Sequence, residues 1–390
     1  MKKIFSYADF DFEIGAYQRI RKTVALGLDK SKFQTIAFSS NENWPEQVIP
    51  IDPNVDGSSI WNKLIPPQSM FNKLHMIKFK SKNLNFMDNI FRFANPEPNF
   101  ISTETWKPRT NICELMLRSL PVKADIFHSI GRPECVWLRN LLKITNPEIK
   151  HVITFYGFFG YGPYLPASKI LARDADIVTA VSKKTKDEVE EACGVDCRVI
   201  YDGVDTKFYA PKEHNNERLR ILYVGGLQER KRPEYVAQMA SKFPQCDFII
   251  HGGGGLQKDL RKMAKKVNNL FIDGKFLSFE ELRKLYTTSD IFFFPSIHEG
   301  FSNVMLEAAA CGLPLVCSNA SSFPEFIDHE KNGFLANDFE EMETHIRYLI
   351  ENESVRKEMG RNSRKRAEEF DWDKIIPQYE KLFEEVMAMK

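Results

Sequence analysis

Short runs of apolar, β-branched and aromatic residues recur along the chain, separated by longer amphipathic stretches. The first half contains "KIFSY", "FQTIAF", "DIFHS", "KHVITF", "DIVTAV" and "CRVIY". After the polar segment 210–218 the rhythm restarts with "LRILYVGG", "CDFIIHGGGG", "NLFIDG", "DIFFFPS" and "LPLVCSN". Strands that alternate with helical segments are typical of parallel α/β structure. The pattern therefore predicts two consecutive doubly wound α/β domains, joined by a linker near residues 204–218.

Length and charge narrow the class of protein. The chain has 390 residues, more than a single hydrophobic core usually supports. Its 54 basic and 53 acidic residues leave a net charge of +1, so no global field attracts nucleic acid. The N-terminal "MKKIFSYADFDF" has no apolar run of signal-peptide length, and nowhere do 18 apolar residues follow one another. We therefore expect a cytoplasmic chain that does not span a membrane.

The stretch "PSIHEGFSNVMLEAAACGLP", residues 295–314, contains a helix with a charged residue in its middle. Ser302 or Asn303 can cap this helix, and Gly312 ends it. Apolar residues lie on every side of it, which predicts a nearly buried helix. Glu307 must then meet a partner or open onto a cavity.

Two carboxylates flank the start of this predicted helix, Glu299 before it and Glu307 within it. Backbone N–H groups at residues 300–303 form a ready anion site, and carboxylates accept hydrogen bonds from hydroxyl groups. A nucleotide sugar offers both phosphates and hydroxyls. The plainer alternative is that Glu307 pairs with a structural arginine or lysine and Glu299 is a solvated loop residue.

These residues resemble the signature of the family-four retaining glycosyltransferases of the GT-B class. The pattern E-G-F-x5-E-A-x-A-x-G-x-P-x-V is matched by Glu299, Gly300, Phe301, Glu307, Ala308, Ala310, Gly312, Pro314 and Val316. Further similar segments are "DIFHSIG", "ADIVTAVSKKTKDEV", "VIYDGVDTKFY", "LYVGGLQERKRP", "FPEFIDHEKNGFL" and "FDWDKIIPQYEKLFEEV". The resemblance covers most of residues 120–375.

The resemblance implies a fold of two Rossmann-like doubly wound domains that face each other across a cleft. The N-terminal domain, residues 1–205, would bind the acceptor. The C-terminal domain, residues 206–371, would bind the nucleotide-sugar donor. Residues 372–390 would form a helix that packs back on the N-terminal domain.

Lys231, in the segment "LYVGGLQERKRP", falls where the family places a lysine against the donor diphosphate. The family also has an arginine where this chain has Gly226. Arg230 or Arg232 can supply that charge, and the alternative is that both are solvated loop residues. A lysine and a helix N-terminus stabilise the negative charge that builds on the leaving oxygens, without a metal. The expected catalytic residues are Glu299 and Lys231.

The resemblance also assigns the donor contacts. Glu299 would contact the sugar hydroxyls and Glu307 the ribose. Base recognition is expected through the backbone of loop 274–277, which leaves uracil and guanine both open. The donor-binding candidates are Glu307, Arg230, Gly300, Phe301, Ser302, Asn303, Gly225, Gly226, Gly15, Lys275 and Phe276.

The acceptor-side candidates are Tyr156, Gly157 and His128. Tyr156 stands where the family often has a histidine near the reacting sugar, although a tyrosine can still donate a hydrogen bond. His128, in "DIFHS", is better explained as a core residue at a strand end, and the alternative is that it faces the cleft. Gly15 is followed by Ala16 where the family usually has two glycines, so the backbone approach to the diphosphate there is a weaker match.

No metal or cofactor is expected, and the nucleotide sugar is a co-substrate. The triplets "DFD" (9–11), "DAD" (174–176) and "DWD" (371–373) are too short to indicate a metal site, and the cysteines lack zinc spacing. The run "GGGG" at 252–255 lacks the third glycine of a dinucleotide fingerprint, since Gln257 stands there.

Residues 61–100 interrupt the α/β rhythm with lysines among aromatic residues. Their basic residues are Lys63, Lys73, Lys78, Lys80, Lys82 and Arg92, against Asp88 and Glu97. Such a segment can rest on an anionic membrane and bring the enzyme to a lipid-linked acceptor at the inner membrane face. The alternative is an amphipathic core helix with a solvated basic face.

Together these features predict a metal-independent retaining glycosyltransferase that moves a hexose from a UDP- or GDP-linked donor to a glycan or glycolipid. In the family, retention is attributed to attack on the front face within a short-lived ion pair, so no enzymic nucleophile is expected. Three alternatives remain: a nucleotide-sugar epimerase or hydrolase of the same fold, an NAD-dependent oxidoreductase, and a catalytically inactive nucleotide-binding homologue.

Overall fold

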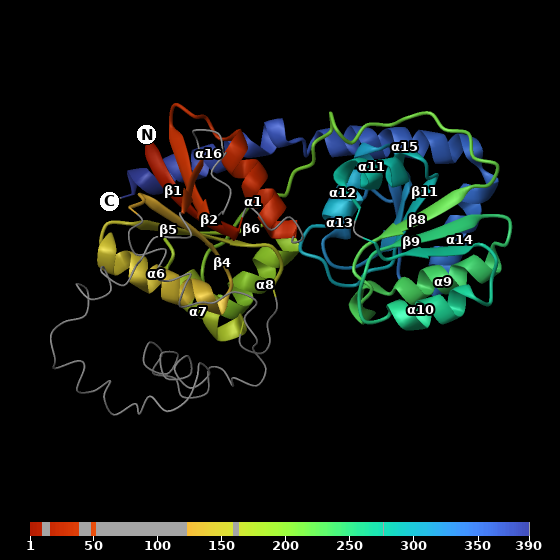
Figure 1. Cartoon of the computed structure of the whole chain (residues 1–390), viewed down its shortest axis with the longest axis horizontal. Coiled ribbons are helices and arrows are strands. Elements are labelled where there is room, and N and C mark those ends of the chain that lie inside the picture. The colour runs from red at the N-terminus through yellow and green to blue at the C-terminus, as the bar shows by residue number, and fades with distance from the viewer. Residues whose placement is uncertain (10–15, 39–47, 52–122, 159–163, 276, 390) are drawn as a thin grey trace, which may run out of the picture. The chain divides into compact units, whose positions relative to one another are not determined.

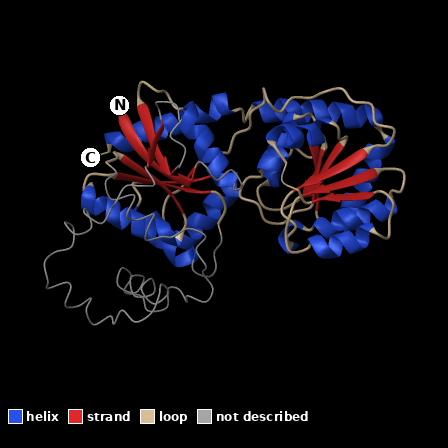
Figure 2. Cartoon of the chain, viewed as in Figure 1, coloured by secondary structure: helices blue, strands red, loops and turns tan. Residues whose placement is uncertain are grey.

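The computed structural model describes residues 1–9, 16–38, 48–51, 123–158, 164–275 and 277–389 (Figure 1). The sequence-based candidates Gly15 and Phe276 and the basic segment 61–100 lie outside the described residues. The chain divides into two compact units. The first contains Met1–Ala180, Lys186–Arg198 and Tyr379–Lys390, and the second contains Val181–Thr185 and Val199–Gln378. Strands and helices alternate in each unit (Figure 2).

The boundaries differ from those expected at residues 205/206 and 371/372. The first falls at 198/199, and the last helix divides after Gln378. Val181–Thr185, at the start of another helix, belong to the second unit. In two of these places the boundary falls inside a continuous helix. A helix that changes units has no loop or change of composition to mark the boundary in the sequence.

The first unit is built on a parallel sheet of seven strands in the order β3-β2-β1-β4-β5-β6-β7. Its strands are β1 (Lys2–Asp9), β2 (Phe33–Phe38), β3 (Val48–Ile51), β4 (Ile126–Ile130), β5 (Lys150–Phe155), β6 (Ile177–Ala180) and β7 (Arg198–Val199). Every residue of β4 and β6 is buried. Such fully buried strands are typical of a parallel sheet with helices on both faces.

The described helices of this part of the chain are α1 (Ala16–Gly27), α6 (Pro133–Thr145), α7 (Tyr164–Asp174), α8 (Lys183–Cys193) and α16 (Trp372–Ala388). The end of α16 contributes to the core of the first unit. Phe383 packs edge-on against Phe33 and His128, with ring centroids 6.1 and 5.4 Å apart. The Lys32 ammonium also lies 2.9 Å from the Glu384 carboxylate. The C-terminal residues of the chain are therefore part of the first unit's fold.

The second unit has a six-stranded parallel sheet in the order β10-β9-β8-β11-β12-β13. Its strands are β8 (Arg220–Val224), β9 (Asp247–His251), β10 (Leu270–Asp273), β11 (Ile291–Phe294), β12 (Leu315–Ser318) and β13 (Gly333–Ala336). Strand order reverses between β8 and β11. In open α/β sheets, ligands bind beyond the carboxyl ends of the strands at such a switch point.

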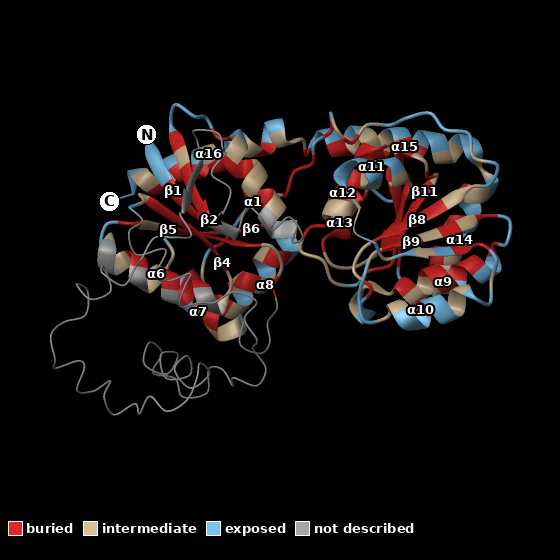
Figure 3. Ribbon diagram, viewed as in Figure 1, coloured by how far each residue is buried: buried red, intermediate tan, exposed pale blue. Residues whose placement is uncertain are grey.

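The sheet of the second unit is mostly buried, while the outer sides of α9 and α10 are exposed (Figure 3). The helices here are η1 (Glu229–Lys231, a 3₁₀ turn), α9 (Pro233–Lys242), α10 (Gln257–Ala264), α11 (Phe279–Thr287), α12 (Asn303–Ala310), α13 (Phe323–Phe326), α14 (Phe339–Glu351) and α15 (Glu353–Glu368). Helix α12 is the one predicted from the two-carboxylate stretch. It starts after Ser302, and beyond its end Gly312 has a φ of +81°.

Asp202, just after β7, is a buried acid with an unusual environment. The residue is 2% exposed, and its Oδ1 has no hydrogen-bond partner among the described residues. Burial raises the pKa of Asp202 well above the ordinary value of 3.8. Because the folded state then binds the proton more tightly than the unfolded state, stability is lost as pH rises from the unfolded pKa through the folded pKa.

Replacing Asp202 by asparagine is therefore expected to raise the melting temperature near neutral pH, because the amide has no proton to release. The gain should shrink toward about pH 4, where the unfolded acid also becomes protonated. Thermal unfolding followed by circular dichroism from about pH 4 to 8 measures it. Asp196→Asn, at an exposed loop position, is the matched control. A gain independent of pH would show that ionisation of Asp202 is not the cause.

Candidate functional site

The candidate site lies in the second unit, where the loops after β8 and β11 meet. The backbone N–H of Ile297 donates to the carbonyl oxygen of Arg230 at 2.9 Å, which joins the two loops directly. Strands β8 and β11 are parallel neighbours, so both loops leave the same edge of the sheet. The loop after β8 contains Lys231, and the loop after β11 contains Glu299. The switch point of the sheet therefore brings the two expected catalytic residues together.

Glu299 is the centre of a charged cluster. Its Oε1 lies 2.9 Å from Lys231 Nζ and 3.5 Å from Arg230 Nη1. The Ser296 hydroxyl, fully buried, donates to the same oxygen at 2.7 Å. The side chains of Lys231 and Glu299 are only 14% and 12% exposed. Two opposite charges in this partly desolvated setting interact more strongly than a surface pair.

The 3₁₀ turn η1 contains Arg230 and Lys231, and Arg232 follows it directly. Lys231 Nζ lies 5.2 Å from the centre of the Phe294 ring, at the end of β11. Arg230 donates to the backbone carbonyl of His298 at 2.6 Å. Arg232 has a left-handed φ of 48°, and its guanidinium lies 5.3 Å from the Tyr235 ring. Of the two arginines that the sequence left open, Arg230 is therefore the one beside Glu299.

The glycines after β8 and β9 let these two loops approach closely. A Cβ atom on Gly252, whose φ is +149°, would lie 1.9 Å from the carbonyl oxygen of Gly225. A Cβ on Gly225 would lie 3.0 Å from the Phe294 ring, whereas Gly226 has nothing nearer than Gln228 at 3.8 Å. The "GGGG" run therefore supports the loop after β8. Gly226, where the family has an arginine, is the roomier of its two glycines.

The start of helix α12 combines backbone N–H groups with polar side-chain atoms that lack partners. Ser302 is 3% exposed. Its Oγ and the Oδ1 of Asn303 have no hydrogen-bond partner among the described residues. Buried polar atoms without partners are costly and call for an explanation. Their position at a helix N-terminus is suited to an anionic ligand.

Phe301, a donor-binding candidate, has its side chain in the core and not in the site. It is 5% exposed, and its ring lies 4.9 Å from Tyr201 and 5.5 Å from Phe370, measured between centroids. Its apolar side chain gains more by joining this aromatic cluster than by facing water. Only the backbone of Gly300 and Phe301 can then serve a ligand.

Glu307 is 5% exposed and accepts a hydrogen bond from the hydroxyl of Tyr286 at 2.9 Å. Burial, followed by the Glu307 carboxylate, raises the pKa of Tyr286 well above its usual range. Burial and Glu307 likewise raise the pKa of the Cys311 thiol to about 12. Both neighbours therefore keep their protons at neutral pH, and Tyr286 remains a hydrogen-bond donor to the buried carboxylate.

Ser296 and Tyr286 were not identified from the sequence. Ser296 precedes Glu299 by three positions in the quoted stretch, so a search for hydroxyls beside the first carboxylate would have found it. Tyr286 lies in α11 and comes close to Glu307 only through packing of α11 against α12. No spacing in the sequence indicates that pair.

The predicted base-recognition loop follows β10. Lys275 is exposed, and its backbone N–H donates to Asp273 Oδ1 at 3.0 Å. Gly274 lies against Gln257, since a Cβ at Gly274 would be 2.0 Å from its amide nitrogen. The described part of this loop contains the exposed side chain of Lys275 as well as backbone groups, and base recognition through its backbone stays a prediction.

The acceptor-side candidates belong to the first unit. Tyr156 and Gly157 follow β5, both partly buried, and the Arg21 guanidinium lies 5.7 Å from the Tyr156 ring. His128 is the core histidine of the two alternatives, because it is 2% exposed and within hydrogen-bond distance of Thr154 Oγ1, at 2.7 Å. It is a core residue, since its ring packs against those of Tyr379 and Phe383 from α16. Burial and the Arg21 charge lower its pKa well below the usual value.

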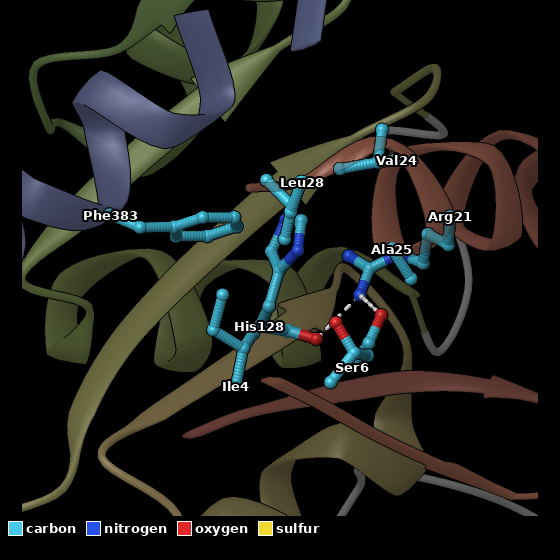
Figure 4. Close-up of a pocket in the computed structure, with 9 residues that line it drawn as sticks. Ile4, Ser6, Arg21, Val24, Ala25, Leu28, His128 and Phe383 are labelled. Atoms are coloured by element: carbon cyan, nitrogen blue, oxygen red, sulfur yellow. Dashed lines mark hydrogen bonds between the residues drawn. The ribbon is translucent and has the colours of Figure 1, made fainter. Parts of the chain in front are cut away.

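His128 lines a small pocket with Arg21, Ser6 and Phe383 inside the first unit (Figure 4). The buried Arg21 donates to the carbonyl oxygens of His128 and Ser129. The parallel pairing of β1 and β4 extends only to Ser6 and His128. The guanidinium thus satisfies strand carbonyls where the two strands separate, which is a structural role.

Two negative observations hold for the described residues. Among them, no three or more histidine, cysteine, aspartate or glutamate side chains are grouped so that they could hold a metal. Within the same ranges, no helix has both the length and the apolar character needed to cross a membrane.

Sequence relatives share part of this chain. The sulfoquinovosyl transferase SQD2 of Arabidopsis thaliana is 30% identical over 191 residues, which cover 45% of this chain and 37% of that protein. Spore coat protein SA of Bacillus subtilis is 27% identical, over 67% of this chain and 78% of its own length. N-acetyl-alpha-D-glucosaminyl L-malate synthase of Bacillus anthracis is 25% identical, over 67% of this chain and 75% of its own length.

Solved structures share the whole fold. Sucrose-phosphate synthase from Thermosynechococcus elongatus has a TM-score of 0.71 at 16% identity and covers 100% of both chains. Anabaena HepE, in complex with UDP and glucose, has a TM-score of 0.70 at 16% identity and covers 99% of this chain and 100% of its own. The architecture is the α/β fold of the GT-B class.

Two family models match consecutive parts of the chain. Glycosyltransferase Family 4 matches residues 90–208, and Glycosyl transferases group 1 matches residues 205–366. The second match contains the whole cluster around Glu299 and helix α12. Because the two models succeed one another as the two units of the fold do, the chain belongs to the family-four glycosyltransferases, the group 1 glycosyl transferases of the GT-B class.

Proposed function

We propose that this protein is a retaining glycosyltransferase that moves a hexose from a nucleoside-diphosphate sugar to a glycan or glycolipid acceptor, without a metal. Family membership carries the general activity, glycosyl transfer. The finer proposal rests on one observation: Lys231 and Glu299 form a partly buried ion pair at the switch point of the second unit's sheet.

In this proposal the cations of the loop after β8 stabilise the leaving group. The bond between the anomeric carbon and the β-phosphate oxygen breaks, and negative charge builds on the diphosphate. Lys231, Arg230 and the first N–H groups of α12 supply positive charge and hydrogen bonds to it. The Ser302 hydroxyl, which lacks a partner among the described residues, can donate another. These groups can carry out this step without a metal ion.

The two carboxylates bind hydroxyl groups. The contacts that Glu299 makes with Lys231, Arg230 and Ser296 all involve Oε1. Its Oε2 can then accept a hydrogen bond from a hydroxyl of the donor sugar. Glu307 accepts from a ribose hydroxyl in addition to Tyr286. Hydrogen bonds to a carboxylate in a partly desolvated site are strong and directional.

Retention follows, in this proposal, from attack on the same face that the diphosphate leaves. The acceptor oxygen forms a new bond to the anomeric carbon within a short-lived ion pair, and the acceptor proton passes to the departing phosphate. Glu299, held by Lys231 and Ser296, acts as a binding group and not as a nucleophile. The two substrates in this proposal are the nucleotide sugar and the acceptor, and no cofactor takes part.

We propose UDP as the first nucleotide to test and GDP as the second. HepE, which shares the fold, was solved with UDP, with UDP and glucose, and with UDP-glucose. Recognition of the base through the backbone of loop 274–275 would favour neither uracil nor guanine. The acceptor, a glycan or a lipid-linked glycan, would bind on the first unit near Tyr156 and Gly157.

A thermal-shift panel tests the donor proposal. UDP, GDP, ADP, their glucose conjugates and NAD are added separately, in EDTA and then with Mg²⁺. Ligand at 100 times its dissociation constant stabilises the folded state by about 2.7 kcal/mol, which is a readily measured shift. We expect one nucleoside diphosphate and its sugar conjugate to raise the melting temperature, and the shift in EDTA should equal the shift with Mg²⁺. A response to NAD alone, or only with Mg²⁺, would contradict the proposal.

A catalytically inactive nucleotide-binding homologue is the second candidate, because Gly226 replaces the family's arginine. Against it, Arg230 places a guanidinium 3.5 Å from Glu299 within the same loop. An epimerase or hydrolase of the same fold would consume the donor without an acceptor. Analysis of products with and without candidate acceptors distinguishes a transferase from an inactive homologue, an epimerase or a hydrolase, since only transfer yields an acceptor of increased mass.

A further inference from the structure

Ser321 holds the Glu299 loop from the side opposite to Lys231. Its hydroxyl accepts a hydrogen bond from the backbone N–H of Glu299 at 2.8 Å and donates to the carbonyl oxygen of the same residue. Ser321 follows β12, and β11 lies between β8 and β12 in the sheet. The loops on both sides of β11 therefore fix Glu299: one contacts its carboxylate and the other its backbone.

The backbone of Ser321 is strained. Its φ is +56°, in the left-handed region, and only Arg232 and Glu330 share this property among the described non-glycine residues. Glycine adopts this conformation without steric cost but has no hydroxyl to offer. Strained residues at functional sites persist where the surrounding contacts hold them in place. Here those contacts are the two hydrogen bonds to Glu299.

We propose that Ser321 is a positioning residue that aims the Glu299 carboxylate at the donor sugar. The inference rests on the proposed function, in which Glu299 binds a sugar hydroxyl. Ser321 acts through the backbone of Glu299 and does not itself touch the donor. Without the Ser321 hydroxyl the backbone of Glu299 can shift. Glu299 Oε1 then still contacts Lys231, but Oε2 no longer points at the sugar hydroxyl. Recognition of the sugar then weakens, and recognition of the nucleotide does not.

Two substitutions at Ser321 distinguish the effect of its hydroxyl from the effect of its strained backbone. Ser321→Gly removes both, and Ser321→Ala removes the hydroxyl while keeping the left-handed strain. We expect the melting temperature to stay constant or rise for glycine and to fall for alanine. Both variants should lose kcat/KM by about 10- to 100-fold, the range expected when a reacting group is misplaced. Glu330→Gly, at an exposed position with a φ of +65°, is the matched control for relieved strain and should keep full activity.

The decisive readout is the ratio of two dissociation constants, measured by calorimetry. It compares a nucleoside diphosphate with its glucose conjugate, using whichever of the uridine, guanosine and adenosine pairs the wild type binds most tightly. Both Ser321 variants should bind the nucleoside diphosphate as the wild type does. Their affinity for the glucose conjugate should fall by the same factor as kcat/KM. A general loss of both affinities would indicate a structural role and overturn the inference.

The outcomes distinguish this inference from the proposed function. If Glu299→Gln impairs sugar binding while both Ser321 variants match the wild type, the positioning role is wrong and the function stands. If Glu299→Gln has no effect, or the wild type binds none of the three pairs, the proposed function fails and the inference fails with it.

Discussion

Replacing Lys231 by alanine is expected to lower kcat by about 100- to 1000-fold, the loss seen when one preorganised group that stabilises developing negative charge is removed. Lys231 Nζ lies 2.9 Å from Glu299 Oε1, and the lysine side chain is 14% exposed, so its charge acts in a setting with little water. The diphosphate gains charge as its bond to the sugar breaks, and the lysine binds that state more tightly than the intact donor. Steady-state release of the nucleoside diphosphate from the sugar nucleotide measures the effect.

The control for this variant lies one residue along the same loop. Arg232→Ala removes a cation that lies over Tyr235 and not beside Glu299, so it should change kcat little. Lys231→Arg keeps a charge and should recover part of the activity. Equal losses for Lys231→Ala and Arg232→Ala would mean that the loop's net charge matters and not the placement of Lys231. Unchanged kcat for Lys231→Ala would remove it from the catalytic site.

Replacing Glu307 by glutamine is expected to weaken binding of the nucleoside diphosphate and its sugar conjugate by about 10- to 100-fold, the worth of one hydrogen bond to a charged group. Glutamine has nearly the same shape, so the buried helix α12 should keep its packing. The fold is expected to remain intact because the amide oxygen can still accept from Tyr286. Calorimetric titration with the nucleoside diphosphate measures the loss.

A nucleotide that lacks both ribose hydroxyls tests the assignment of Glu307. If the carboxylate binds the ribose, the 2′,3′-dideoxy nucleoside diphosphate should bind the wild type and Glu307→Gln equally well. Tyr286→Phe, which removes the hydroxyl 2.9 Å from Glu307, should weaken nucleotide binding less than Glu307→Gln. The same loss with both nucleotides would show that Glu307 supports α12 and does not contact the ribose.

The sequence alone predicted the α/β class, two successive domains and the loops that form the site. Apolar runs of strand length separated by amphipathic stretches allow few other architectures. The two-carboxylate stretch also predicted helix α12, since its capping residues, its helix formers and Gly312 are local signals. The family could be identified from the same stretch, because Glu299, Glu307 and the small residues that follow them match the family's signature.

The sequence could not predict contacts between segments that are distant along the chain. Phe301 and His128 were candidates for the site, and packing placed both side chains in the core. The sequence pattern around an apolar or aromatic residue near a strand end is the same whether its side chain faces a ligand or the interior. The unit boundaries inside α8 and α16 were also missed, because a continuous helix has no sequence signal where it changes units.

The tertiary structure decided which residues surround the two carboxylates. Parallel neighbours in the sheet bring the loops after β8, β11 and β12 to one edge, and only that arrangement places Lys231 and Ser321 on opposite sides of Glu299. Packing of α11 against α12 supplies Tyr286 to Glu307. The residue types of the site are a local property of the sequence. Their partners are set by strand order and helix packing, which depend on the whole chain.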